Sequence, residues 1–175
     1  MGDGWLPSFV VPDDVRTGAK VIAHHKAGGK IAGMDRGVQA GDVIKVGKTV
    51  ELECLDTPGH TFCHICLLAH GAQGDSPAIF SGDTLFNAGA GNVHNGGGID
   101  ELYATFADQL AKLPDNTRVY PGHDYIATNL KFTLAREPDN AAAQALLSTV
   151  ANHDPATSIV TTLKDEKQHN TFFRL

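Results

Sequence analysis

Short apolar runs, each followed by a turn, divide the first 120 residues of the chain. They predict strands at residues 20–24, 42–46, 49–56, 62–69, 78–80 and 117–120. Gly47 and Lys48 separate two of these runs, which predicts a hairpin with Val50, Leu52 and Cys54 alternating onto one face. Residues 62–69 are nearly all apolar, as in a strand buried on both faces. The glycine-rich stretch 27–41 predicts a loop.

A helical period replaces this pattern in the second half. Leu102, Phe106, Leu110 and Leu113 form one apolar stripe of a helix that we expect Asp100 to cap. Residues 124–136 and 140–152 predict two further helices. We expect a long glycine-rich loop at 87–98, and an irregular tail at 154–175 whose Phe172 and Phe173 pack onto the body. The alternation of strands and helices predicts an α/β fold.

Composition narrows the class of protein. The 175 residues suit one domain, and a net charge of −6 argues against nucleic acid or an anionic membrane as the main partner. No apolar run approaches the roughly 18 residues of a transmembrane helix. Cys54, Cys63 and Cys66 lack the spacing of a disulfide framework, which favours a reducing, cytoplasmic location. Pro7 and Pro12 interrupt the first apolar residues, so we expect an irregular arm at residues 1–19.

Three turns carry side chains that bind metals. His60, Asp83 and His123 each follow an apolar run on a turn that contains glycine. Taken singly, His60 could be a turn histidine, Asp83 an Asx-turn residue, and His123 a residue at a helix N-terminus. Three matched strand–turn contexts favour one metal centre instead, because strand ends hold exposed side chains rigidly.

These residue types also indicate the reaction class. Imidazole and carboxylate suit zinc, iron or manganese, and a carboxylate between two ions bridges them. Such ions lower the pKa of a bound water and polarise a carbonyl, so hydrolysis is the reaction that we expect.

The chain resembles the metallo-β-lactamase superfamily and, within it, the glyoxalase II (hydroxyacylglutathione hydrolase) branch. The resemblance covers residues 20–175. It is carried by residues 57–61 (Thr-Pro-Gly-His-Thr), 82–86 (Gly-Asp-Thr-Leu-Phe), 121–125 (Pro-Gly-His-Asp-Tyr), 129–132 (Asn-Leu-Lys-Phe) and 170–174 (Asn-Thr-Phe-Phe-Arg). It implies an αββα sandwich and a metal-dependent thioester hydrolase with up to two ions.

The same resemblance implies roles for single residues. His60 would bind the first metal and His123 the second, with Asp83 as the catalytic bridging ligand. Tyr125 matches a tyrosine that helps to hold the glutathione part of the substrate, and Arg174 matches a basic residue of that pocket.

Two departures from the family pattern change these expectations. The family's His-x-His-x-Asp-His segment, which supplies about half of the metal ligands, is absent from the sequence. We therefore expect an N-terminally truncated sandwich, mostly its second half plus the C-terminal helices, with weak metal binding and impaired hydrolysis. Asn92 and His94 occupy the loop positions where glutathione-specific members carry Lys and Tyr. A general thioester or ester is the substrate class that this loop favours.

We expect three segments: the arm at 1–19, a partial metallo-β-lactamase-like domain at 20–137, and a C-terminal helical segment of the glyoxalase II type at 138–175. A sheet without its covering half would expose apolar surface and an open edge, which predicts a homo-oligomer.

Two other functions stay open. A truncated or pseudoenzyme form would act at most as a binding module. An iron-dependent enzyme similar to the persulfide dioxygenases would use His60, Asp83 and His123 for one iron.

The remaining histidines and cysteines have simpler interpretations. His24 and His25 are adjacent on a predicted strand and should point to opposite faces, which disfavours a ligand pair. Cys63 and Cys66 resemble a zinc knuckle in spacing, but no second pair exists, so core cysteines are the better interpretation. His64 resembles a structural histidine of the family. We expect surface positions for the other three, His70, His153 and His169.

Overall fold

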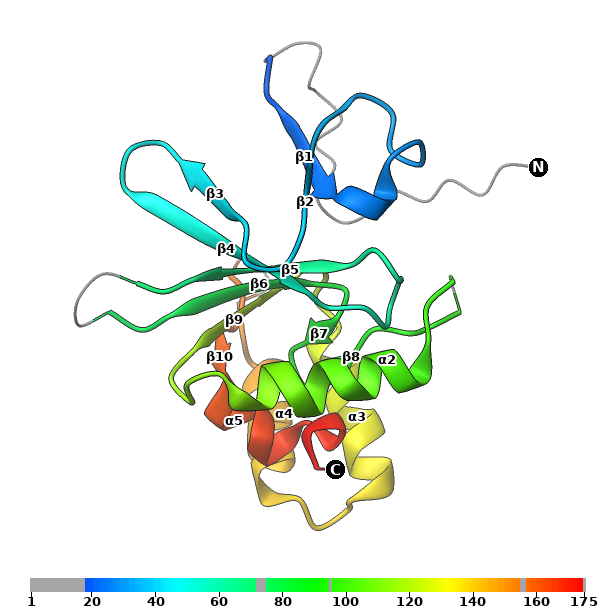
Figure 1. Cartoon of the computed structure of the whole chain (residues 1–175). Coiled ribbons are helices and arrows are strands. Elements are labelled where there is room, and N and C mark those ends of the chain that lie inside the picture. The colour runs from blue at the N-terminus through cyan, green and yellow to red at the C-terminus, as the bar shows by residue number, and fades with distance from the viewer. Residues whose placement is uncertain (1–17, 72–74, 95, 155–156, 175) are drawn as a thin grey trace.

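A six-stranded sheet organises the chain (Figure 1). The computed structural model describes residues 18–71, 75–94, 96–154 and 157–174, so most of the arm expected at 1–19 lies outside it. The sheet runs in the order β10-β9-β6-β5-β4-β3. Its strands are β3 (Val43–Val46), β4 (Val50–Asp56), β5 (Ile65–Ala69), β6 (Ala78–Gly82), β9 (Arg118–Pro121) and β10 (Thr161–Thr162). Neighbouring strands in the sheet run antiparallel, with the exception of β6 and β9, which run parallel.

The predicted hairpin is confirmed by β3 and β4. Gly47 takes a positive φ of 63° in the turn, and Val46 pairs with Val50 beside it. The strand expected at 62–69 begins only at Ile65, and its residues alternate between buried and half-buried. The expectation of burial on both faces is therefore wrong. Cys66 and Leu68 face the helices, while Leu67 between them faces the other side.

The loop expected at 27–41 contains a strand. β2 (Met34–Val38) runs parallel to β1 (Val21–His24) in a separate two-stranded sheet. The Asp35 carboxylate accepts the backbone N–H of Val21, and Gly37 packs against His25, where a Cβ would lie 2.9 Å from the His25 Cα. The glycine is thus a close-approach residue within a strand. Its neighbours supply too few apolar side chains to reveal that strand in the sequence.

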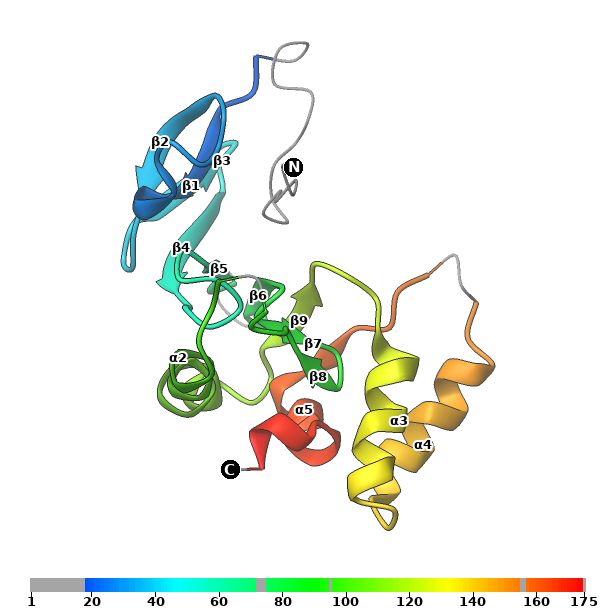
Figure 2. The same cartoon turned by 90° about the vertical axis from the view of Figure 1, so that its right-hand side faces the viewer.

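The α-helices of the described residues lie on one side of the six-stranded sheet, as Figures 1 and 2 show from two directions. They are α2 (Ile99–Ala104), α3 (Ile126–Arg136), α4 (Ala141–Ala151) and α5 (Leu163–His169). Helix α2 continues through a π-helical turn (Thr105–Gln109) and a 3-10 turn (Leu110–Lys112), and a further 3-10 turn (Thr171–Phe173) follows α5. No helix in the described part of the chain is both long and apolar enough to cross a membrane.

Two helix predictions need correction. The N-cap of α2 is Gly98 in an extended conformation, and Asp100 lies inside the first turn, where a carboxylate favours the helix dipole. The tail from 154 is not irregular, because it contains β10 and α5. A capping box begins α5: the Thr162 side chain accepts from the Asp165 N–H, while the Asp165 carboxylate accepts from the Thr162 N–H.

The main core lies between the sheet and α2, its continuation and α5. Phe106 and Leu110 of the predicted stripe pack there, and Leu102 and Leu113 border them, which confirms the stripe. Phe173 also packs against this core, as predicted. The buried members from other elements are Cys66, Leu68, Ile79, Leu85, Val119 and Leu163. A second cluster, around Ile126, Leu130 and Ala143, joins α3 to α4.

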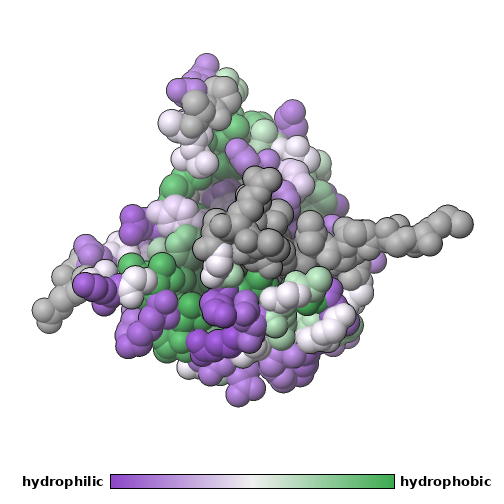
Figure 3. Space-filling model, turned by 90° about the horizontal axis from the view of Figure 1, so that it is seen from above, coloured by the Kyte–Doolittle hydropathy of each residue, from purple (hydrophilic) through white to green (hydrophobic). Residues whose placement is uncertain are grey.

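The opposite side of the sheet carries a second set of apolar residues. Phe80 pairs with Leu67 on one side and Tyr120 on the other, and the two aromatic rings stack at 5.5 Å. Leu52 lies on this side as well, and we call these four residues the open face. Viewed from the side away from the helices, hydrophobic residues gather over part of the molecule (Figure 3). Helices α2, α3, α4 and α5 lie on the other side of the sheet (Figure 1).

We expect Leu110→Ala to lower the free energy of unfolding by about 2–5 kcal/mol, because Leu110 is fully buried and its truncation leaves a cavity. The matched control is Val46→Ala, which removes apolar atoms from a side chain that is 52% exposed. It should change the free energy by no more than about 0.5 kcal/mol. Urea unfolding of both variants measures this, and equal losses would contradict the assignment of the core.

Candidate metal centre

The parallel pairing of β6 with β9 brings two of the three predicted ligands together. Gly82 pairs with Pro121 at the carboxyl ends of these strands, and the Gly122 N–H donates to the Gly82 carbonyl at 2.9 Å. Asp83 and His123 follow directly and leave the sheet at the same edge. Adjacent parallel strands end at one edge by geometry, so this meeting is a consequence of topology.

The third predicted ligand reaches the same place from β4. The turn after this strand packs against the α2 region: the Thr105 hydroxyl donates to the Pro58 carbonyl at 2.7 Å, and a Cβ on Gly59 would lie 2.5 Å from the Leu102 Cα. Gly59 also has a φ of 148°, which side chains rarely adopt. The glycine therefore lets the turn approach the helix and direct His60 toward Asp83.

The Asp83 carboxylate lies between the two imidazoles. His123 Nδ1 donates to Asp83 Oδ1 at 2.8 Å, and His60 Nε2 faces Asp83 Oδ2 at 3.6 Å. His60 and Asp83 are largely buried, whereas the His123 side chain is 47% exposed. The structure thus brings together all three residues that the sequence singled out, with the carboxylate in the middle.

A backbone carbonyl determines the tautomer of His60. His60 Nδ1 lies 2.7 Å from the Asn92 carbonyl oxygen, which can only accept a hydrogen bond. Nδ1 must therefore carry the proton, and in the neutral ring Nε2 carries the lone pair on the side of Asp83. An Nδ1–H bonded to a carbonyl is the usual support for a metal-binding histidine.

His64 supports the backbone of Asp83 from below. Its Nε2 accepts the Asp83 N–H at 3.2 Å, so its Nδ1 carries the proton and lies 3.0 and 2.9 Å from the hydroxyls of Thr57 and Thr84. Both hydroxyls donate elsewhere, Thr57 to Cys66 Sγ and Thr84 to the Thr57 carbonyl, and are left to accept. Burial, and secondarily the nearby His60, lowers the pKa of His64 to about 4.

The donors fit a metal in type but not in number. Two donor atoms on one tetrahedral zinc lie roughly 3.4 Å apart, because zinc–nitrogen and zinc–oxygen bonds are each about 2.1 Å. The His60–Asp83 separation of 3.6 Å suits such an ion. The His123–Asp83 distance of 2.8 Å is instead that of a direct hydrogen bond. Among the described residues, no group of three or more His, Cys, Asp or Glu side chains is arranged to hold one ion.

Aromatic rings border the site beside His123. Tyr125 stacks on the His123 ring at 5.4 Å, and Phe86 meets both rings edge-on, at 6.1 Å from His123 and 5.3 Å from Tyr125. Tyr125 is about half exposed. Tyr125 thus lies next to His123, while its role in substrate binding stays a prediction.

The other residues predicted to contact substrate are Asn92, His94 and Arg174. Asn92 reaches the site through its carbonyl, and its side chain accepts from the backbone N–H of His94. Arg174 is held by Glu137, with a shortest ion-pair distance of 2.6 Å. The hydrogen bond from Arg174, with a further one from Asn140, lowers the pKa of Glu137 to about 2. Within the described ranges the hydrogen bonds and ion pair of Arg174 go to Glu137 and to the Gln168 carbonyl, and not to the candidate ligands.

The remaining histidines separate into structural and exposed residues. His24 is buried, faces Asp56 at 3.4 Å and accepts from the Lys26 N–H. Burial lowers its pKa, and Asp56 opposes that shift. His24 and His25 do not point to opposite faces, because β1 ends at His24 and a 3-10 turn (His25–Ala27) follows; their rings stack at 4.7 Å.

The surface position expected for His169 is wrong. It is buried and lies 3.1 Å from Glu166. His70 is exposed as expected, and His153 is half-exposed. Cys66 is a core cysteine, as predicted, and burial raises the pKa of its thiol to about 12. Cys63 precedes β5 instead of lying in it.

A hollow of about 260 Å³ lies next to the site on the side of His64. His24, Asp56 and Phe62 also line it. His60, Asp83 and His123 are not among its lining residues, so the hollow adjoins the metal centre and does not enclose it.

We expect the free energy of unfolding to fall as the pH drops from 6.5 to about 4. The folded chain keeps His64 neutral, whereas the unfolded chain binds its proton near pH 6.5, so protonation favours unfolding in this window. The loss is up to about 3 kcal/mol, since one pKa unit corresponds to about 1.4 kcal/mol. Urea unfolding with chelator present measures it. His64→Asn should remove this step, and identical pH profiles would contradict the assignment.

Known proteins resemble the chain in sequence. Residues 124–175 match the family described as "Hydroxyacylglutathione hydrolase C-terminus". A protein named hydroxyacylglutathione hydrolase from Polaromonas sp. is 79% identical over 91% of this chain, and one from Nitrosococcus oceani is 60% identical over 91%. One from Arabidopsis thaliana, named hydroxyacylglutathione hydrolase cytoplasmic, is 37% identical over 83%. The chain spans 59%, 60% and 57% of these relatives, respectively.

Solved structures share the fold. The crystal structure of ETHE1 from Myxococcus xanthus matches with a TM-score of 0.62 and 29% identity, over 90% of this chain and 53% of that one. A metallo-β-lactamase from Staphylococcus aureus matches with a TM-score of 0.63 and 22% identity, over 92% of this chain and 42% of its own. The predicted α/β fold of the metallo-β-lactamase type is confirmed. The chain is thus similar in sequence to proteins named hydroxyacylglutathione hydrolase and shares its fold with a metallo-β-lactamase.

Proposed function

We propose that the chain carries part of the site of a metal-dependent thioester hydrolase of the glyoxalase II type. The arrangement of His60, Asp83 and His123 supports this proposal most directly. The carboxylate lies between two imidazoles, and one of these has its tautomer determined by a carbonyl. This is the arrangement expected of a bridging carboxylate with one histidine on each side.

Each residue then has a distinct task. His60 Nε2 and Asp83 Oδ2 would hold one ion, and His123 with Asp83 Oδ1 a second one after their hydrogen bond opens. Zinc, iron or manganese bound there would lower the pKa of a coordinated water and polarise the thioester carbonyl. Tyr125 would support the substrate at the open side of His123, where its ring is exposed. Asn92 and His94 would border the substrate from the loop after Ala90.

Residues 20–137 would form the metallo-β-lactamase-like part and 138–175 the C-terminal segment. Arg174 would have to leave Glu137 to meet a substrate carboxylate. Two protein donors for each ion are fewer than the three that catalytic zinc usually has, so this chain would bind metal weakly and hydrolyse slowly. We propose a cytoplasmic location, supported by three free cysteines and by the cytoplasmic relative.

A non-catalytic binding module is the second candidate. The small number of protein donors favours it, because catalytic zinc usually has three and each position here has two. An iron-dependent enzyme of the persulfide dioxygenase type would use the same three residues and would consume oxygen.

The open face supports a further proposal, that two or more copies of the chain associate. Phe80, Tyr120 and Leu67 form a contiguous apolar surface on the side of the sheet away from the helices. Burial of such a surface against a second copy removes it from water.

With zinc in excess, we expect slow hydrolysis of a glutathione thioester. The value of kcat/KM should be lower than that of the 79% identical Polaromonas relative by roughly 100-fold or more, because losing metal ligands costs at least as much as losing their supporting partners. Asp83→Asn should abolish the activity. Turnover equal to that of the relative would contradict the predicted impairment, and unchanged turnover in Asp83→Asn would refute the site. Complete absence of hydrolysis would favour the binding module.

We expect light scattering at micromolar concentration to give a mass above that of one chain. Phe80→Lys should shift the mass toward the monomer, because a charge on the open face opposes its burial. Tyr103→Lys is the matched control, since Tyr103 is an exposed aromatic residue of α2 on the helical side. A monodisperse monomer for the unchanged chain would refute the association.

A further inference from the structure

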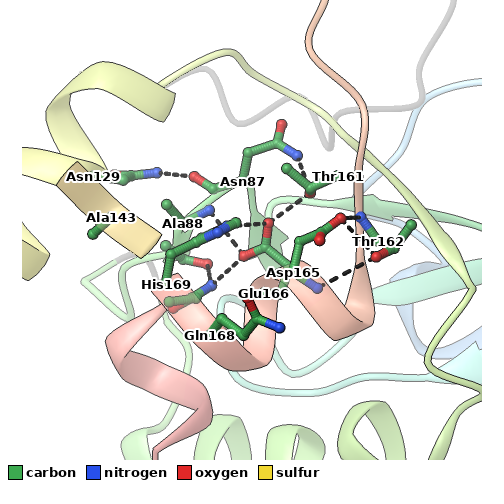
Figure 4. A network of polar contacts seen from close by, with 12 residues as sticks. Asn87, Ala88, Asn129, Ala143, Thr161, Thr162, Asp165, Glu166, Gln168 and His169 are labelled. Carbon is green, nitrogen blue, oxygen red and sulfur yellow. Dashed lines mark hydrogen bonds and ion pairs between the residues drawn. The ribbon is translucent and has the colours of Figure 1, made fainter. Parts of the chain in front are cut away.

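A buried carboxylate in α5 collects four hydrogen bonds (Figure 4). Glu166 has no exposed surface. Its Oε2 accepts the Ala88 N–H and the Asn170 side-chain amide, each at 2.9 Å. Its Oε1 accepts the Thr161 hydroxyl at 2.6 Å and His169 Nε2–H at 3.1 Å. A buried carboxylate with this many donors is expensive to assemble, which indicates a specific task.

These bonds tie the C-terminal segment to one particular hairpin. β7 (Leu85–Phe86) and β8 (Gly89–Ala90) form a two-stranded antiparallel sheet directly after Asp83. Its tip is held by Glu166 at the Ala88 N–H, by Asn170 at the Gly89 carbonyl and by Asn129 at the Asn87 carbonyl. Ala88 has a φ of 58°. A residue other than glycine keeps this conformation only where its surroundings enforce it.

The same hairpin supports both histidines of the metal centre. At one end, Phe86 meets the His123 and Tyr125 rings edge-on. At the other, the chain continues through Gly91, whose N–H donates to the Thr84 carbonyl, to Asn92, whose carbonyl accepts from His60. A side chain at Gly91 would collide with the Asp83 carbonyl, so this segment lies directly against the bridging residue.

We infer that Glu166 is a positioning residue of the metal centre: it holds the β7–β8 hairpin so that the Asn92 carbonyl orients His60 and Phe86 supports His123. Its relevance to metal binding rests on the proposed function. A purely structural role, in which Glu166 only stabilises α5, predicts different behaviour for variants that loosen the two elements separately.

Three variants separate these roles. Glu166→Leu keeps the volume but removes every acceptor, so the Ala88 N–H loses its partner. Glu166→Gln is the conservative variant. The glutamine oxygen can accept the hydrogen bonds from Ala88 and Asn170. The glutamine amide can donate to Thr161 and His169, because a hydroxyl and a neutral imidazole can both accept. Thr162→Ala is the matched control: it removes the capping box of α5, in which Thr162 bonds to Asp165 and not to the hairpin.

Two sets of measurements apply to each variant. The first, on the metal-free chain, comprises NMR of the His60 imidazole, hydrogen exchange of the Gly91 N–H and the melting temperature Tm. The second is zinc affinity, by competition with a chromophoric chelator. In Glu166→Leu we expect the His60 signal to shift, Gly91 exchange to accelerate, and the zinc Kd to rise by roughly tenfold or more. Glu166→Gln should stay near the unchanged chain. Thr162→Ala should lower Tm only.

The inference is refuted if Glu166→Leu leaves His60, Gly91 and the zinc Kd unchanged, or if Thr162→Ala shifts them equally. Where Glu166→Leu does not fold, Asn170→Ser replaces it, since it removes the bond to the Gly89 carbonyl and should give the same changes in smaller measure. A chain that binds no zinc would refute the proposed function, while the metal-free readouts would still decide the role of Glu166.

Discussion

The parallel pairing of β6 with β9 is the constraint on which the site depends. Because Gly82 lies beside Pro121, the chain leaves both strands at one edge of the sheet, and Asp83 and His123 meet there without any long-range adjustment. The rest of the structure completes this meeting. Gly59 brings the His60 turn onto the helical layer, and His64 anchors the Asp83 backbone from beneath. A carboxylate between two imidazoles is the result.

The support of the site comes from a part of the chain that is remote in sequence. Asn87 and Ala88 bond to residues more than 70 positions later, through Thr161 and Glu166. The C-terminal segment therefore does more than cover the core: it holds the hairpin whose Phe86 meets His123 and whose continuation reaches His60 through the Asn92 carbonyl. This gives the residues that match the hydroxyacylglutathione hydrolase C-terminus a physical connection to the candidate metal centre that lies before them in sequence.

The sequence predicted the elements whose pattern is strong and local. The β3–β4 hairpin, the apolar stripe from Leu102 to Leu113, and helix α4 all follow from periodicity and turn chemistry. β2 was missed because Gly37 serves close packing and gives no apolar alternation. α5 was missed although Thr162 and Asp165 have the spacing of a capping box, since its face is built on the buried Glu166 and His169.

For the site, strand–turn contexts predicted His60, Asp83 and His123, which the fold brings together. Those contexts could not predict the supports of these residues. The hydroxyls of Thr57 and Thr84 matter only because His64 lies between them, and Glu166 has no local pattern that indicates a partner at Ala88. Arg174 matched a substrate contact by resemblance, but the fold pairs it with Glu137. Long-range polar pairing is set by tertiary structure, and so the sequence alone does not reveal it.

Equilibrium dialysis of the chain against zinc, with Asp83→Asn dialysed in parallel, tests whether Asp83 is a metal ligand. We expect saturable zinc binding that depends on Asp83, since this carboxylate lies beside both histidines. Zinc binding that is absent at millimolar concentration, or that persists unchanged in Asp83→Asn, would contradict this assignment.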